Sequence, residues 1–117
     1  MQHVLMKINL KPGSFQKFMK YVEEFASRRD ECDASLKGEG ADIESFFIVG
    51  KEVFVYKRVK DLKAARAYQK TSDNPIYKVM DKMYADCIAS IEEAYSVLAF
   101  EIGRAKPKSK SRSKPKD

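Results

Sequence analysis

The stretch that decides the fold is residues 40–59, GADIESFFIVGKEVFVYKRV. β-Branched and aromatic residues fill both halves of it, and Gly50 and Lys51 separate the two halves. A glycine at the first central position of a two-residue loop is typical of a type II′ hairpin. The stretch therefore predicts two antiparallel strands, over residues 41–49 and 52–59.

An acidic residue interrupts the first of these strands. Glu44 stands directly before the run SFFIV at 45–49, where the pattern favours an apolar or neutral side chain. A buried carboxylate without a partner is strongly unfavourable. Glu44 therefore either reaches solvent, loosely paired with Lys57 or Arg58, or lies in a polar pocket beside a cation or water. The sequence leaves both alternatives open.

The chain before the hairpin supplies a strand and a helix. Residues 3–10, HVLMKINL, alternate in the manner of a strand. Apolar residues then recur at helical spacing over 15–36, which predicts one helix of about five to six turns. Ser14 is expected to cap this helix, and the glycines of KGEG at 37–40 are expected to end it.

The chain after the hairpin supplies a split helix and a last strand. Asp61 is expected to cap a short helix through Tyr68, and TSDNP at 71–75 interrupts it. A second helix with an apolar stripe continues to Ile91, and YSVLAFEI at 95–102 predicts the fourth strand. The order β-α-β-β-α(split)-β predicts a ferredoxin-like α+β fold with an antiparallel four-stranded sheet.

Charge divides the chain of 117 residues, whose net charge is +6 at pH 7, into two parts. Residues 104–117 hold seven of the 23 basic and one of the 17 acidic side chains, which leaves 16 of each in residues 1–103. We expect one domain over 1–103 and a disordered basic tail over 104–117. Weak non-specific nucleic-acid contact through the tail is one expectation, and a solubilising role is the alternative. The basic residues concerned are Arg104, Lys106, Lys108, Lys110, Arg112, Lys114 and Lys116.

Composition argues against several classes of protein. The sequence has no run of about 20 apolar residues and no signal-peptide pattern, so we expect no membrane span and a cytoplasmic location. Cys32 and Cys87 fall on apolar helix stripes, which predicts neither a disulfide nor a zinc site. We expect no metal and no cofactor, since His3, the one histidine, lies near a chain end.

Both faces of the predicted sheet carry apolar side chains. In the strand over 41–49, Phe47 and Val49 lie on one side while Phe46 and Ile48 lie on the other. A second apolar face would be open to water in a monomer, which soluble proteins seldom tolerate. We therefore expect a homodimer in which two sheets meet face to face.

Polar residues on the strands predict a ligand site. Lys7 and Asn9 on the first strand, Glu44 on the second, and Tyr56 and Arg58 on the third can converge on one cleft. The expected ligand is a small polar or anionic metabolite, with Glu44 as general acid or base. Whether the site catalyses a reaction is left open.

Arg28 on the first helix is a further candidate for holding an anionic ligand. The alternative is an ordinary ion-paired helix face with Glu24, Asp30 or Asp33.

The order of elements resembles the dimeric α+β barrel superfamily across residues 2–103. RRDE at 28–31, EGADIESFF at 39–47 and SDNPI at 72–76 resemble a small family of uncharacterised domains, and the chain is distantly similar to rhamnose mutarotases. This resemblance implies proton-transfer isomerase or mutarotase-like activity, with Tyr21 near the position of the mutarotase tyrosine. The mutarotases' histidine and tryptophan pair have no counterpart here.

Two classes of function follow. The first is a dimeric barrel domain that binds, and isomerises by proton transfer, a small polar metabolite. The alternative is a non-enzymatic dimer whose basic tail tethers it to nucleic acid or another anionic partner.

Overall fold

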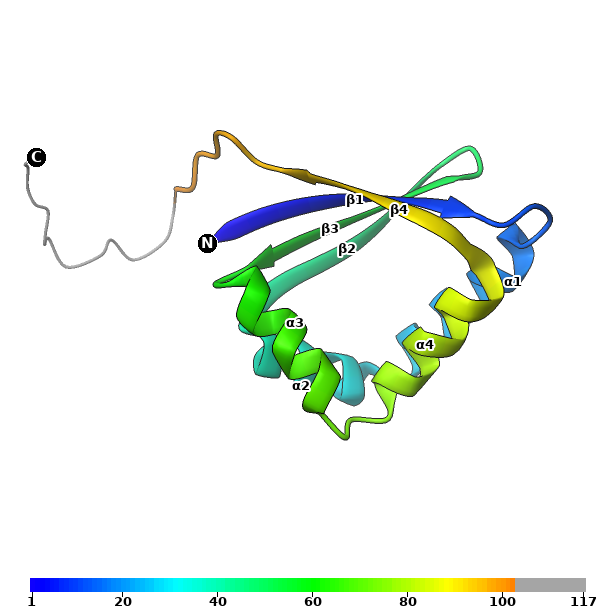
Figure 1. Ribbon diagram of the computed structural model, residues 1–117, viewed down its shortest axis with the longest axis horizontal. Helices are drawn as coiled ribbons and strands as arrows, with labels where there is room; N and C mark the ends of the chain where they lie inside the picture. The colour runs from blue at the N-terminus through cyan, green and yellow to red at the C-terminus, as the bar shows by residue number, and fades with distance from the viewer. Residues whose placement is uncertain (103–117) are drawn as a thin grey trace, which may run out of the picture.

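A computed structural model describes residues 1–102 and shows a ferredoxin-like α+β fold (Figure 1). The elements are β1 (Gln2–Leu10), α1 (Phe15–Ser27), α2 (Arg29–Glu39), β2 (Ala41–Val49), β3 (Glu52–Val59), α3 (Leu62–Thr71), α4 (Ile76–Cys87) and β4 (Ile88–Tyr95). The strands form one antiparallel sheet in the order β2-β3-β1-β4. The predicted fold class is confirmed. The predicted tail over 104–117 lies outside the described residues.

The helices cover one face of the sheet, and the core lies between them (Figure 1). Each fully buried aliphatic or aromatic side chain contributes about 1.5–3 kcal/mol, so this cluster holds the helices on the sheet. Its buried members are Ile8, Phe18, Val53, Val55, Met83 and Cys87. No helix within residues 1–102 is long and apolar enough to span a bilayer.

The hairpin forms where the sequence predicts it. β2 and β3 have the expected bounds, and Val49 lies opposite Glu52. Gly50 in the loop has a φ of 64°, in the left-handed region that glycine adopts without strain.

The predicted single helix over 15–36 is wrong, because the chain forms two helices that meet at Arg28. Arg28 leaves the helical conformation with φ −115° and ψ 48°, and its N–H donates to the carbonyl of Phe25. Residues 27–31, SRRDE, carry no apolar side chain, so nothing on the helix face holds a straight helix onto the sheet there. Ser14 precedes α1 without capping it, since its hydroxyl donates to the carbonyls of Lys11 and Cys87.

The predicted last helix and last strand are also wrong in their bounds. α4 ends at Cys87, and Ile88–Tyr95 forms β4 along β1, with Val4 opposite Tyr95. The alanines and glutamates of IASIEEAY favour helix by propensity, but pairing with the edge of β1 overrides that preference. Residues 96–102, expected to form the fourth strand, follow β4 without regular structure.

Candidate functional site

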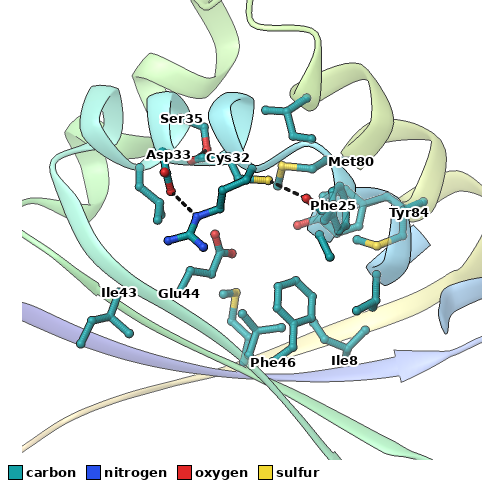
Figure 2. Close-up of a pocket in the computed structure, with 18 of the residues that line it drawn as sticks. Ile8, Phe25, Cys32, Asp33, Ser35, Ile43, Glu44, Phe46, Met80 and Tyr84 are labelled. Atoms are coloured by element: carbon teal, nitrogen blue, oxygen red, sulfur yellow. Dashed lines mark hydrogen bonds and ion pairs between the residues drawn. The ribbon is translucent and has the colours of Figure 1, made fainter. Parts of the chain in front are cut away.

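A cavity of about 550 Å³ lies between the helix-covered face of the sheet and helices α1, α2 and α4 (Figure 2). Its volume is within the range of small-molecule sites in proteins. Most of its wall is apolar, with Phe25, Phe46 and Met80 among the lining residues. The polar side chains that line it are Arg29, Cys32, Asp33, Ser35, Asp42, Glu44 and Tyr84.

Glu44 is the carboxylate that β2 directs into this cavity. It lies opposite Lys57 of β3, on the helix-covered face, and its side chain points toward α2 (Figure 2). Among residues 1–102, no hydrogen bond joins the Glu44 carboxylate to another group. Burial raises the pKa of Glu44 above its ordinary value, nearby Glu39 adds to the rise, and the Lys57 ammonium opposes it.

Lys57 does not neutralise Glu44, because it forms an ion pair with Glu39. Both side chains are buried, and each residue is 5% exposed. The Tyr77 hydroxyl donates to the same Glu39 carboxylate at 2.5 Å. Burial and this hydrogen bond raise the pKa of Tyr77. The Lys57 ammonium is thus paired with Glu39 in the protein interior. It attracts the Glu44 carboxylate only from a longer distance.

A thiol and a phenol face the same cavity. The Cys32 thiol donates to the carbonyl of Phe25 at 3.4 Å, and Tyr84 lies across the cavity on α4 (Figure 2). Burial and then the charge of Glu44 raise the pKa of Cys32. The same two causes raise the pKa of Tyr84. Both groups therefore stay protonated and serve as hydrogen-bond donors.

Ion pairs occupy the other charged residues of the wall. Arg29 Nε donates to Asp33 at 2.9 Å on α2. Arg58 donates through two nitrogens to the two oxygens of Asp42, each at 2.8 Å. Asp42 therefore joins the cavity wall to the opposite face of the sheet.

The structure does not bring Glu44 together with the other predicted strand residues. Lys7, Asn9, Tyr56 and Arg58 lie on the face that the helices leave open, where Tyr56 bonds to His3 Nδ1 and Asn9 donates to Ser90 and Glu92. The prediction of one shared cleft is therefore wrong in its geometry.

A bulge in β2 explains this difference. Ala41 lies opposite Val59, but the register then shifts, so that Ile43 lies opposite Arg58 and Glu44 opposite Lys57. Without the extra residue, Glu44 would lie opposite Tyr56, as strict alternation predicts. One inserted residue moves every later side chain to the other face.

Tyr21 and Arg28 lie outside the cavity wall. The Tyr21 hydroxyl donates to Asp86 at 2.5 Å, which raises the pKa of Tyr21 to about 12. Arg28 pairs with Glu24 at 3.0 Å and Glu31 at 3.2 Å, in agreement with the ion-paired alternative. The predicted contacts of the tail, from Arg104 to Lys116, lie outside the described residues.

The sequence analysis named Lys57 only as a loose partner of Glu44 and missed its buried ion pair with Glu39. A signal for Lys57 was present, since it takes the position of a valine in the alternation of Val53, Val55 and Val59. Glu39 gave no such signal, because it stands between two glycines at the end of a helix. Within residues 1–102, no group of three or more His, Cys, Asp or Glu residues is placed to hold a metal ion.

Solved structures share this fold at low sequence identity. A Nitrosomonas europaea protein, described as a candidate antibiotic biosynthesis monooxygenase, has a TM-score of 0.60 and 15% identity, covering 86% of this chain and all of that one. A Chloroflexus aurantiacus protein of the same description has a TM-score of 0.53 and 13% identity, covering 88% of this chain and 100% of that one. A NIPSNAP domain protein from Burkholderia xenovorans has a TM-score of 0.56 and 13% identity, covering 85% of this chain and 95% of that one.

No curated protein matches the chain. At these identities the structural likeness shows the fold alone, which agrees with the dimeric α+β barrel resemblance of the sequence. A family model matches residues 1–106, and the chain therefore belongs to the family described as "Family of unknown function (DUF6176)".

Proposed function

We propose that the cavity binds a small molecule with an apolar body and one polar end, and that Glu44 exchanges a proton with the polar end. The observation that carries this proposal is the Glu44 carboxylate, which points into a mainly apolar cavity with no hydrogen-bond partner among residues 1–102. The mainly apolar wall favours a ligand with an apolar body over the wholly polar metabolite expected from the sequence, since a wholly polar ligand would leave most of this surface uncompensated.

The environment of Glu44 suits a group that both donates and accepts a proton. Because its pKa is raised, the Glu44 side chain stays protonated to a higher pH than the side chain of an exposed glutamate. The protonated acid gives its proton to a ligand oxygen, and the resulting carboxylate takes a proton from a neighbouring C–H or O–H group. The net change is an isomerisation, with Tyr84 as a donor that holds the ligand.

A ligand screen by thermal unfolding tests this proposal, with small aromatic and aliphatic alcohols, ketones and hydroxy acids as probes. A ligand at 100 times its Kd stabilises the wild type by about 2.7 kcal/mol. Met80→Trp, which fills the cavity, is expected to abolish the stabilisation by the ligand. Glu44→Gln is expected to weaken binding and to raise Kd at least tenfold.

Glu23→Gln, an exposed change on α1, is the matched control and should bind as the wild type does. If Met80→Trp bound every active probe with the Kd of the wild type, the ligand would bind outside this cavity, and the proposal would be wrong. Isomerisation at the wild-type rate by Glu44→Gln would remove Glu44 from the chemistry.

We also propose that the open face of the sheet pairs with a second copy of the chain. This face and its edge strand carry exposed apolar side chains, including Leu5, Phe47 and Val49. Monomers rarely leave such a surface in water.

The tethering function of the basic tail stays a second proposal, favoured by the concentration of charge after Gly103. Its test is retention of the full chain on duplex DNA in low salt. Deletion of residues 104–117 should abolish retention, whereas retention of the shortened chain would contradict the proposal. The cytoplasmic location is likewise a prediction from the sequence.

A further inference from the structure

The charges of the cavity wall do not balance at Glu44. The charged residues that line the cavity are Arg29, Asp33, Asp42 and Glu44. Arg29 pairs with Asp33, and Asp42 accepts two hydrogen bonds from Arg58. Among residues 1–102, no ion pair includes Glu44. When Glu44 is ionised, the described wall therefore holds one negative charge without a counterion.

Lys57 does not supply the missing counterion. It lies opposite Glu44 in the sheet, but its ammonium pairs with Glu39, and both members of this pair are buried. The attraction that Lys57 exerts on Glu44 and the repulsion that Glu39 exerts on it oppose each other. We therefore expect the counterion of Glu44 to come from a ligand.

The wall also offers Glu44 few hydrogen-bond donors. The Cys32 thiol donates to the carbonyl of Phe25, and the Ser35 hydroxyl donates to the carbonyl of Cys32. Both groups thus donate to the backbone of the helices. Among the described residues of the wall, Tyr84 is the remaining side chain with a hydroxyl. A carboxylate accepts several hydrogen bonds, and an ammonium group brings three donors where a hydroxyl brings one.

Aromatic rings lie beside this carboxylate. Phe46 is two residues after Glu44 on β2, so both side chains point from the same face of the sheet into the cavity (Figure 2). The centroid of the Phe46 ring lies 6.4 Å from that of Phe18 and 6.3 Å from that of Phe25. The face of an aromatic ring attracts a cation. A cation at Glu44 therefore gains a second attraction that a neutral or anionic group lacks.

The same charges disfavour an anionic ligand. A ligand carboxylate beside an ionised Glu44 would experience repulsion between like charges. Arg29 is the one cationic residue among the described lining residues, and it does not reverse this preference. Its side chain is 81% exposed, and its Nε already donates to Asp33 at 2.9 Å.

We propose that this cavity binds a primary amine with an apolar body, held as its ammonium ion by the Glu44 carboxylate and the neighbouring aromatic rings. This inference rests on the cavity site proposed above, but not on the isomerisation. When a protonated Glu44 meets a neutral amine, the carboxyl proton moves to the nitrogen lone pair and no other bond changes. The result is an ion pair of carboxylate and ammonium, and the apolar body lies against side chains such as Phe25 and Met80.

Isothermal titration calorimetry on the full chain at pH 7 tests the proposal with three probes that have the same carbon skeleton: benzylamine, benzyl alcohol and benzoate. An alkylamine is cationic at this pH, as lysine is. Benzylamine should bind with a Kd at least tenfold lower than that of benzyl alcohol, because hydrogen bonds between charged groups are the stronger ones. Benzoate should bind most weakly. Hexylamine, hexanol and hexanoate repeat the comparison with an aliphatic body.

Variants of the wall are compared through the ratio of the alcohol's Kd to the amine's Kd. Glu44→Gln keeps the size of the side chain and removes its charge, so this ratio should fall to about one. Phe46→Leu removes the ring, so the ratio should fall at least twofold. Glu23→Gln on α1 is the control and should keep the wild-type ratio. A general loss of the cavity changes both Kd values, whereas loss of the ammonium site changes their ratio.

A wild-type ratio of one or less, or an unchanged ratio in Glu44→Gln, overturns the inference. The outcomes also separate it from the proposed reaction. If the alcohol binds as tightly as the amine and both are weakened in Glu44→Gln, the preference for an amine is wrong and the proposed function stands. If the amine binds in a Glu44-dependent manner but no probe is isomerised, the inference stands and the proposed reaction is wrong. If none of the six probes binds, both are wrong.

Discussion

At the scale of single residues, a buried ion pair between Lys57 and Glu39 lies near the Glu44 carboxylate, which has no hydrogen-bond partner among residues 1–102. Lys57 lies opposite Glu44, yet its ion-pair partner is Glu39, which Tyr77 also holds. If Lys57 paired with Glu44 instead, the cavity would contain a neutralised carboxylate with a low pKa. The Glu39–Lys57 pair therefore leaves Glu44 with a raised pKa, which suits the proton exchange that we propose.

The stability of the Glu44→Gln variant tests this environment. The folded-state pKa of Glu44 is raised, so the folded protein binds this proton more tightly than the unfolded chain. Ionisation of Glu44 therefore lowers the free energy of unfolding as pH rises from the ordinary pKa of 4.5 through the raised pKa of the folded state. Chemical unfolding should find Glu44→Gln more stable than the wild type at pH 8, with the difference smaller at pH 4.

Glu23→Gln serves as the control and should show no such pH-dependent gain. A Glu44→Gln variant that is less stable than the wild type at pH 8 would show that the carboxylate has a favourable partner.

Removal of one member of the buried pair should be costly. Lys57→Met leaves the Glu39 carboxylate uncompensated and is expected to lower the unfolding free energy by about 3–5 kcal/mol. The double variant Glu39→Gln/Lys57→Met should recover a large part of this loss. Lys60→Met, at an exposed neighbouring position, is the control. If the losses in unfolding free energy of the two single variants simply added in the double variant, Glu39 and Lys57 would not be coupled.

At the scale of elements, local patterns predicted what lies within a strand or helix, and long-range pairing decided the rest. The hairpin over 41–59 was predictable because its loop glycine and its alternation agree. The bulge near Asp42 was not, since no residue in ADIES marks an insertion. IASIEEAY became β4 because β1 had a free edge, which no local propensity reveals.

The contact of α2 with α3 provides a test at this scale. Gly38 packs so closely on the ring of Tyr68 that a Cβ atom there would lie 2.0 Å from a ring carbon. Gly38→Ala should therefore lower the unfolding free energy by about 1–3 kcal/mol through overpacking. Thermal unfolding measures this, and Gly38→Ala/Tyr68→Leu should be more stable than Gly38→Ala alone. An unchanged midpoint in Gly38→Ala would contradict the close contact.

At the scale of the whole molecule, the two faces of the sheet have separate roles. The helix-covered face lines the cavity that contains Glu44, and the open face carries exposed apolar side chains, which we propose pair with a second copy. Sequence alone predicted the fold class and the surplus of apolar strand residues, because both depend on periodicity. It did not predict which polar residues share a face, because one bulge reverses that assignment.

The role proposed for Glu44 is tested most directly by an NMR titration of its side-chain carboxyl in the full chain, with the Glu44→Gln spectrum used for assignment. We expect a pKa above the ordinary value of 4.5 and a further change when a ligand fills the cavity. A Glu44 carboxyl that titrates at or below 4.5 would show that it is solvated or paired, and would contradict its role as the proton-exchanging acid of the cavity.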